Sequence, residues 1–134
     1  MRLTSFTDYG LRVLMRLAGA PGQTVTTEAI AGEFAISRHH LTKVVAALSA
    51  AGIVESQRGA GGGLRLARPA EAITIGEVVR LLEARQALVE CFRADGGACA
   101  LTPRCRLKGR LFQARAAFLR ELDGATLAEC AYPA

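Results

Sequence analysis

Two short helical patterns joined by a very short break restrict the fold of this chain more than any other feature. The first pattern runs from Thr26 to Phe34 and repeats its apolar residues at helical spacing. After a break at residues 35–37, the second begins with Ser37 as a candidate N-cap and ends at Gly52, which suits the left-handed C-cap conformation. Its inner face is expected to consist of Leu41, Val44, Val45 and Leu48. Two helices joined by so tight a turn are typical of a helix-turn-helix unit.

The segments on either side of this pair extend the unit. Residues 5–19 repeat apolar side chains at helical spacing and predict a preceding helix. Residues 53–57 and 64–67 are strand-like, and the glycine-rich segment 58–63 between them predicts a hairpin tip. A phosphate-cradling loop is the weaker interpretation, because the segment lacks the Lys and the Ser or Thr of such loops. The first 70 residues are therefore predicted to form a winged helix-turn-helix domain.

The second half predicts a loop followed by a long helix. Thr74 and Glu77 form a capping box before a short apolar helix, and residues 85–102 show no clear period. Thr102 is a candidate N-cap with Pro103 at the first helical position, which predicts a helix over residues 103–122. Its apolar residues form a narrow seam that suits packing against a second copy, although the same stripe also fits a core within one chain: Leu107, Leu111, Ala114, Phe118 and Leu122.

The predicted fold class is mainly α with a small β-hairpin wing. We expect a winged helix-turn-helix DNA-binding domain over residues 1–70. Residues 71–134 are expected to supply a cysteine-containing loop at 91–105 and a long dimerisation helix at 103–122.

Charge and side-chain chemistry indicate a nucleic-acid partner for the first half. The chain has a formal net charge of +5 at pH 7, and residues 1–70 hold 8 bases against 4 acids. Positive charge on a helix-turn-helix is typical of DNA binding. Recognition helices present their first residues to base edges in the major groove, and a wing reaches phosphates or the minor groove. The expected DNA-contacting residues, each of which taken singly is equally well a surface residue, are Ser37, Arg38, His39, Thr42 and Lys43, then Arg58 and Arg65 with Arg68 nearby.

The chain contains 4 cysteines, and the rest of the sequence predicts a reducing compartment for them. No apolar signal-peptide run follows Met1, and no stretch reaches the roughly 18 apolar residues that a membrane span needs. A cytoplasmic protein with no membrane partner is therefore expected. Thiols stay reduced in the cytoplasm, which argues for metal or redox chemistry over a disulfide frame.

Three of the cysteines are grouped, with seven residues between Cys91 and Cys99 and five between Cys99 and Cys105. This spacing differs from the Cys-x2-Cys pairs of a zinc ribbon, which disfavours zinc without excluding it. Cys105 lies in the first turn of the predicted helix, where the helix dipole favours the thiolate. Bases crowd the same helix start; a bound anion such as an iron–sulfur cluster would offset them, although they equally suit DNA or solvent: Arg104, Arg106, Lys108, Arg110 and Arg115.

Several segments together resemble one known family. Residues 1–12 (MRLTSFTDYGLR), 58–66 (RGAGGGLRL) and 101–108 (LTPRCRLK) are similar to the NsrR-type nitric-oxide-sensing repressors within the larger IscR-like winged helix-turn-helix family. The resemblance covers nearly the whole chain. It implies a dimer that holds a 4Fe–4S cluster at its periphery, near the DNA-binding domain, with Cys91, Cys99 and Cys105 as the protein thiolates.

The resemblance also implies a fourth cluster ligand, an acidic residue of the partner's first helix, and Asp8 is the matching position here. Taken alone, Asp8 is a helix-start acid that stabilises the dipole. The first gap between the cysteines is longer than is typical of IscR-like members, which keeps a 2Fe–2S cluster open as the alternative.

The function implied by the resemblance is that of a repressor. A cluster-loaded homodimer would bind a palindromic operator in double-stranded DNA, and nitric oxide would react with the cluster and lower operator affinity. The alternatives are an IscR-like or general redox regulator, a zinc-dependent or thiol-based regulator, and an electron-transfer protein, which has no use for a recognition helix. An enzyme is not expected, because the sequence shows no nucleophile–base pair or carboxylate dyad.

Overall fold

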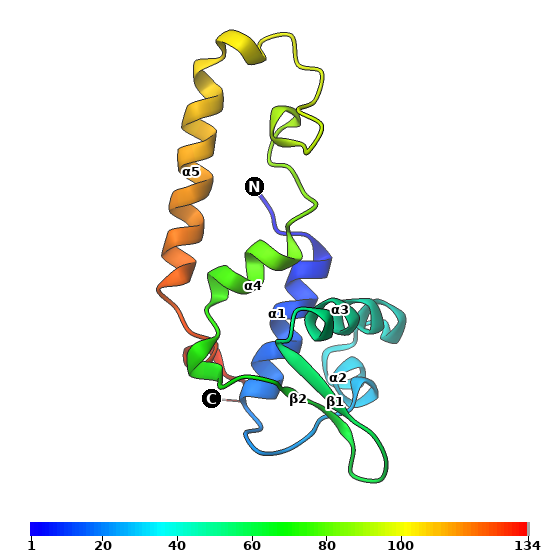
Figure 1. Ribbon diagram of the computed structural model, residues 1–134. Coiled ribbons are helices and arrows are strands. Elements are labelled where there is room, and N and C mark those ends of the chain that lie inside the picture. The colour runs from blue at the N-terminus through cyan, green and yellow to red at the C-terminus, as the bar shows by residue number, and fades with distance from the viewer. Residues whose placement is uncertain (134) are drawn as a thin grey trace.

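The structure of the protein, a computed structural model, describes residues 1–133. Figure 1 shows α1, α2, α3 and the β-hairpin grouped together, α4 lying between α1 and α5, and α5 running along one side towards a loop at the far end. This arrangement confirms the predicted class, mainly α with a small β-hairpin wing. The elements are α1 (Ser5–Ala18), α2 (Thr27–Phe34), α3 (Arg38–Ala50), β1 (Val54–Gln57), β2 (Gly63–Leu66), α4 (Ile75–Leu82) and α5 (Arg106–Asp123), with 3-10 turns η1 (Ala70–Ala72), η2 (Glu90–Phe92), η3 (Thr102–Arg104) and η4 (Ala128–Cys130).

Local sequence signals explain where most helices begin and end. The turn between α2 and α3 starts at Ala35, which adopts the left-handed conformation (φ 53°), and Gly52 (φ 73°) follows the end of α3. Ser37 is the N-cap residue of α3 as predicted, but its side chain makes no capping hydrogen bond. The first turns of α1, α2 and α4 are capped by threonine hydroxyls that each accept a backbone N–H three residues on, those of Thr4, Thr26 and Thr74.

The wing is attached to the helical domain along one strand and at its tip. β1 and β2 pair antiparallel, with Val54 opposite Leu66. Val25, which precedes α2, exchanges two backbone hydrogen bonds with Leu64 of β2, at 2.9 and 2.8 Å. The hydroxyl of Thr24 donates to the Gly61 carbonyl in the hairpin tip at 2.8 Å. These contacts hold the tip in one place relative to α2.

Aliphatic side chains from both halves of the chain form a single core. Leu14 and Leu41 of the first half are 0% exposed, and so are Ile73 and Leu127 of the second half. Each such burial stabilises the fold by roughly 1.5–3 kcal/mol. Because Ile73 and Leu127 share this core with α1 and α3, the predicted boundary at residue 70 falls between two segments that pack together.

The long helix begins later than predicted. Residues 102–104 form the 3-10 turn η3 without a side-chain cap, and the Thr102 hydroxyl is buried without a hydrogen-bond partner among the described residues. The predicted cap at Thr102 is therefore wrong. Cys105 has an extended backbone (φ −82°, ψ 112°) that separates this turn from α5, and Cys105 itself occupies the N-cap position.

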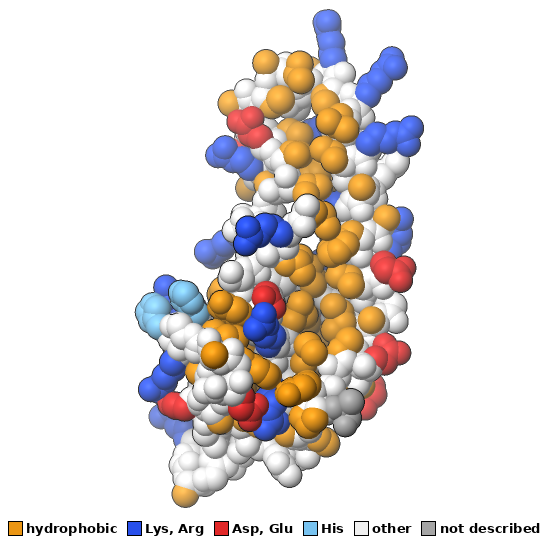
Figure 2. All heavy atoms as spheres, turned by 180° about the vertical axis from the view of Figure 1, so that it is seen from behind, with side chains coloured by type: hydrophobic (Ala, Val, Ile, Leu, Met, Phe, Trp, Pro, Cys, Tyr) orange, Lys and Arg blue, Asp and Glu red, His pale blue; other side chains and the backbone are white. Residues whose placement is uncertain are grey.

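No side chain of α5 is buried within the single chain. Leu107 and Phe112 are 61% and 55% exposed. Figure 2 shows hydrophobic side chains forming a band along the middle of this face of the molecule. Of the predicted seam, Leu107 and Ala114 are exposed in one protomer, whereas Leu111, Phe118 and Leu122 are half-buried. None of the described helices is both long and apolar enough to cross a membrane.

Arg68 joins the end of the wing to α4. Its guanidinium donates to both carboxylate oxygens of Glu77 at 2.8 Å and to the Ala72 carbonyl at 3.3 Å. The Glu77 carboxylate accepts from Arg68, and the Glu77 N–H donates to the Thr74 hydroxyl at 3.1 Å, as the predicted capping box requires. This hydrogen bonding holds the pKa of the Glu77 carboxyl below its ordinary value.

The Arg68–Glu77 pair gives a pH-dependent prediction. A carboxyl whose pKa is lowered by folding adds stability above its ordinary pKa, and this stability is lost as the pH falls through the folded pKa. We expect Arg68→Gln to lower the free energy of unfolding at pH 7 by less than about 1 kcal/mol, because the pair is partly exposed. Urea titrations between about pH 7 and pH 3 should show this difference disappearing towards acid. A difference that stays constant over the whole range would contradict the assignment.

Candidate nucleic-acid interface and cysteine loop

The predicted recognition residues lie on the exposed side of α3. Ser37, Arg38, His39, Thr42 and Lys43 are all exposed, while the buried residues of the helix face the core. Thr42 Oγ1 donates to the Arg38 carbonyl at 2.9 Å, which fixes the hydroxyl. A helix that presents small polar and cationic side chains at its start matches the donors and acceptors of the major groove. Contact of these residues with DNA remains a prediction.

An aromatic stack joins the start of α3 to α1. The His40 ring stacks on Tyr9 with centroids 6.4 Å apart, and His39 lies 6.3 Å from His40. The Arg12 guanidinium lies over the Tyr9 ring at 5.7 Å. Figure 2 shows the histidine side chains together at one edge of the molecule. The sequence analysis predicted His39 as a site residue but not the stacking of His40 on Tyr9, because no sequence pattern indicates this contact between α1 and α3.

The three predicted wing cations differ in how free they are. Arg58 is exposed at the hairpin tip and forms no ion pair within residues 1–133. Arg65 Nε donates to Glu55 across the hairpin at 2.6 Å, and both side chains are about half exposed. Arg68 is held by Glu77, so the structure gives it a part in joining the wing to α4.

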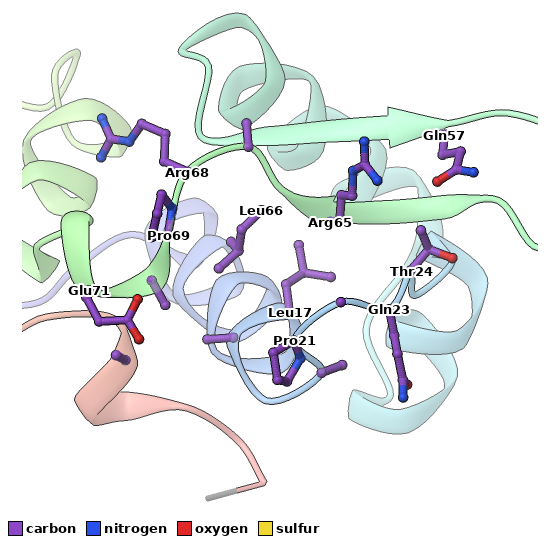
Figure 3. A pocket seen from close by; sticks show the side chains of 16 residues that line it. Leu17, Pro21, Gln23, Thr24, Gln57, Arg65, Leu66, Arg68, Pro69 and Glu71 are labelled. Atoms are coloured by element: carbon purple, nitrogen blue, oxygen red, sulfur yellow. The ribbon is translucent and has the colours of Figure 1, made fainter.

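A hollow behind the wing is lined by the end of α1, by β2 and by η1 (Figure 3). Arg65 and Arg68 border it, but each guanidinium is bound to a glutamate elsewhere, Glu55 and Glu77. Both cations that border the hollow are therefore already paired with carboxylates, and Cys91, Cys99 and Cys105 do not line it.

The hairpin tip depends on glycine at position 62. A Cβ there would lie 2.2 Å from the Gln57 carbonyl oxygen, which is backbone and cannot move without opening the hairpin. We expect Gly62→Ala to displace Arg58 and weaken DNA binding about tenfold, since wing contacts contribute to phosphate binding. Gly32→Ala is the control, because a Cβ at Gly32 meets nothing within 4 Å. Fluorescence anisotropy with labelled duplex measures both, and equal affinities for the two variants would contradict the prediction.

The structure places the cysteines on one loop but does not close them around a metal. Cys91 lies in η2, Cys99 in the following loop, and Cys105 at the N-cap of α5. All three are half-buried free thiols, as is Cys130. Within residues 1–133, no group of three or more His, Cys, Asp or Glu side chains is close enough to hold a metal ion. The three predicted thiol ligands are therefore present, but in this structure they do not lie close enough together to bind one metal ion.

The loop nevertheless folds back on itself. The Ala98 N–H donates to Glu90 Oε1 at 3.2 Å, which brings the residues before Cys91 and Cys99 together. Gly97 is in the left-handed region (φ 67°), and a Cβ there would lie 2.6 Å from the Glu90 carbonyl oxygen. This tight approach requires glycine, so the loop has a defined turn between its first two cysteines.

An aromatic contact holds the start of the loop against α5. Phe92, next to Cys91, meets Phe112 edge-on at 6.3 Å, and the Arg115 guanidinium lies 4.8 Å from the Phe92 ring centroid. Phe92 and Cys105 line the same open hollow. The first and third predicted thiol segments thus border one space beside the start of α5.

Two cations, Lys108 and Arg115, line that space, and neither forms an ion pair within residues 1–133. Within the described chain, the bases at the helix start form no ion pairs, namely Arg104, Arg106, Lys108 and Arg110. Positive charge at a helix N-terminus is unfavourable, because the helix dipole is positive at the same end. An anion bound there would interact favourably with the cations and with the dipole. Three free thiols beside unpaired cations fit the requirements of a thiolate-ligated cluster.

Asp8 lies in the first turn of α1, on its exposed side. Its carboxylate oxygens accept from Arg12 Nε and Nη2 at 2.9 and 3.0 Å, and both side chains are nearly half exposed. Within its own protomer Asp8 is therefore the partner of Arg12 and contacts no cysteine.

Sequence reasoning missed the residue that fixes the start of α1. Glu83, at the end of α4, accepts hydrogen bonds from the Thr4 N–H and from the hydroxyls of Thr4 and Thr7. Thr7 is 0% exposed. No local motif links Glu83 to residues 76 and 79 positions earlier, so only the fold reveals this contact.

The fold and the exposed basic face of α3 and the wing define a winged helix-turn-helix DNA-binding protein. The chain belongs to the Rrf2 family, described as an iron-dependent transcriptional regulator, whose family model matches residues 3–132. Regulators of this family bind DNA, and the matched relatives are regulators and not enzymes.

The named relatives support the resemblance found from the sequence. The chain is 51% identical over 131 residues to the HTH-type transcriptional regulator NsrR of Geobacillus kaustophilus (strain HTA426), a match covering 96% of this chain and 88% of that protein. The crystal structure of the oxidized form of Staphylococcus aureus CymR is similar with a TM-score of 0.77 at 30% identity, covering 98% and 97% of the two chains. IscR of T. potens has a TM-score of 0.75 at 28% identity, covering 96% and 84%.

Proposed function

We propose that this chain is a homodimeric repressor that binds a palindromic operator and senses nitric oxide through an iron–sulfur cluster. The observation that carries the proposal is the set of three half-buried free thiols beside the unpaired cations of α5, in a chain 51% identical to a protein named NsrR. Such a protein acts where its operator lies, in the cytoplasm.

The DNA-reading role rests on the exposed start of α3 and on the anchored wing. Arg38, His39 and Lys43 face outwards with Ser37 and Thr42, so they are the proposed base-contacting set. Arg58 and Arg65 project from the wing towards phosphate or minor groove. Two such units related by a two-fold axis would read half-sites about one helical turn apart.

The dimer is proposed from the exposed apolar side chains of α5. Leu107 and Phe112 are more than half exposed in the single chain, on a helix that buries no side chain of its own. An apolar face of this kind on a soluble regulator marks an interaction surface. We assign it to a second copy of the chain.

The cluster would be held by Cys91, Cys99 and Cys105, with the partner subunit's Asp8 as the fourth ligand. When bound, the cluster would supply iron that reacts with nitric oxide. We propose a 4Fe–4S cluster, with a 2Fe–2S cluster, which also takes four protein ligands, as the alternative. To serve as ligand, Asp8 must leave the Arg12 guanidinium that holds it in this structure.

The exchange of Arg12 for the cluster as the partner of Asp8 would couple the cluster to the DNA-binding helices of this chain. Asp8 and Arg12 lie on α1, and the Arg12–Tyr9–His40 contacts lead from there to the start of α3. A carboxylate that binds the neighbouring subunit in one state and Arg12 in the other would change α1 and α3 together. Operator affinity would then differ between the two states.

The test is operator binding by protein purified without oxygen. Iron, sulfide and zinc are assayed first, and an operator is selected from a random duplex pool. Binding is then measured before and after stoichiometric nitric oxide, and separately after oxidation alone. The proposal expects iron and sulfide, and an affinity loss of at least tenfold with nitric oxide. Unchanged affinity would refute the nitric oxide switch, and zinc in place of iron would refute the cluster.

A thiol-based regulator is the second candidate. The specific observation in its favour is that Cys91, Cys99, Cys105 and Cys130 are all half-buried free thiols. The oxidized CymR structure adds that a fold relative exists in an oxidized form. Loss of operator binding on mild oxidation of metal-free protein, with no response of the loaded form to nitric oxide, would favour this candidate.

A further inference from the structure

An acidic side chain lies inside the face proposed to read DNA. Glu28, in the first turn of α2, binds Arg38 at the start of α3, with Arg38 Nη2 2.6 Å from Glu28 Oε1. Both side chains are more than half exposed, at 67% and 57%. An exposed pair of this kind contributes about 0–1 kcal/mol to the free energy of folding, so its contribution to stability is small.

The position of Glu28 places it where a DNA backbone would approach. Glu28 lines a shallow groove between the start of α2 and the wing, together with Gln57 and Gly62. Phosphates carry charge at every step of any duplex, so a free guanidinium at this place would bind them whatever the base sequence. The other cation of the α3 face, Lys43, forms no ion pair within residues 1–133, and neither does Arg58 at the wing tip. Among the predicted DNA-contacting cations, Arg65 is paired with Glu55 inside the wing, and Arg38 is paired with a carboxylate of α2.

A neutralised arginine discriminates between DNA sequences better than a free one. A free guanidinium on a long flexible side chain gains phosphate contacts on any duplex, which raises affinity without sequence preference. An arginine already bound to a carboxylate gains little from a phosphate. Only a bidentate contact with a base edge offsets the free energy lost when its ion pair breaks.

We propose that Glu28 is a positioning residue for Arg38, holding its guanidinium for base contacts and away from phosphates, so that Glu28 raises the preference of the protein for its operator over other DNA. This role rests on the DNA-reading function proposed above for Arg38. It is separate from the cluster, because neither residue contacts a cysteine or Asp8.

The experiment compares four proteins on two duplexes. Wild type, Glu28→Gln, Arg38→Ala and the double variant are titrated against the duplex that wild type selects from a random pool and against a random duplex of equal length. Glu33→Gln is the matched control, because Glu33 lies on the same helix and pairs with Arg16 on α1. Anisotropy is measured over a range of salt concentrations.

We expect Glu28→Gln to bind the random duplex about threefold to tenfold more tightly, with a salt slope steeper by about one, because one phosphate contact is gained. The selected duplex should gain less, so the operator preference falls. In the Arg38→Ala background, Glu28→Gln should change neither affinity, and Glu33→Gln should behave as wild type.

Two results would overturn the inference while leaving DNA binding intact. One is an unchanged operator preference in Glu28→Gln. The other is an equal gain for Glu28→Gln with and without Arg38, which would mean that Glu28 repels phosphates directly. If wild type selects no duplex, the DNA-reading function itself fails, and the role of Glu28 fails with it.

Discussion

Replacing Cys105 with serine is expected to abolish the visible absorption of the anaerobically purified protein and to reduce its iron and sulfide to background. Cys105 is a half-buried free thiol at the N-cap of α5, beside the hollow that it shares with Phe92. A thiolate is the soft ligand that iron–sulfur clusters use, and a neutral hydroxyl of the same shape does not replace it. Nitric oxide should then leave operator binding unchanged, because the sensing iron is gone.

Serine is the informative substitution because it keeps the fold. Cys105 makes no side-chain cap hydrogen bond, whereas serine is among the preferred N-cap residues and stabilises a helix start by about 1 kcal/mol. The melting temperature of the cluster-free variant should therefore equal or exceed that of cluster-free wild type. Loss of iron in Cys105→Ser then reports on ligation and not on unfolding.

Cys130→Ser is the matched control. Cys130 is also a half-buried free thiol, but it lies in η4 at the other end of α5. This variant should keep iron, sulfide and the response to nitric oxide. Iron assay, visible absorption and circular dichroism measure all of these. Full cluster content in Cys105→Ser, or its loss in Cys130→Ser, would refute the proposed ligand set.

Elements specified by neighbouring residues were predictable from the sequence. The break at 35–37, the glycine-rich tip and the helix starts at Thr26 and Thr74 each depend on residues within one or two turns, and all of them occur in the structure. The start of α5 was placed three residues early, because Thr102 and Pro103 are good helix-start residues that here form a separate 3-10 turn. The extended backbone of Cys105 that causes this break has no sequence signal.

The residues of the candidate sites were predictable from their types and positions, but the side chains that bind them were not. Sequence placed Arg38, Arg65 and Arg68 near the DNA face, but the carboxylates that bind them are 10, 10 and 9 positions away and come from other elements. The cysteines were identified by number and setting, and under the proposed function the cluster itself would bring them together, since metal binding and folding are coupled at such sites. The contact between Glu83 and α1 spans most of the chain, so local patterns could not reveal it.

Glu83 leads to the second large effect. Its carboxylate holds the Thr4 N–H and two threonine hydroxyls at the start of α1, and one of these belongs to Thr7, which is 0% exposed. Removing the carboxylate leaves a buried hydroxyl and a backbone N–H without their acceptor, and each such loss costs about 1–3 kcal/mol. Water reaches this partly buried site, which limits the total.

We expect Glu83→Ala to lower the free energy of unfolding by about 2–4 kcal/mol, which corresponds to a melting temperature roughly 10 °C lower for a chain of this size. Glu83→Gln should cost about half as much, because an amide oxygen still accepts one of the hydrogen bonds. Glu121→Gln is the control, since the exposed Glu121 side chain has no partner among residues 1–133. Thermal and urea unfolding of the three variants measure the differences, and a Glu83→Ala protein as stable as Glu121→Gln would contradict the assignment.

The same substitution tests how the cluster depends on α1. Asp8 follows Thr7 directly, so a first turn that frays without Glu83 displaces the carboxylate proposed as the fourth ligand in the neighbouring subunit. Glu83 also precedes the loop that carries Cys91, and one side chain therefore connects both parts of the proposed ligand set. Glu83→Ala should lose its cluster to a chelator several times faster than wild type, at a temperature where both are folded. Equal rates would mean that Asp8 is positioned without Glu83, or that it is not a ligand.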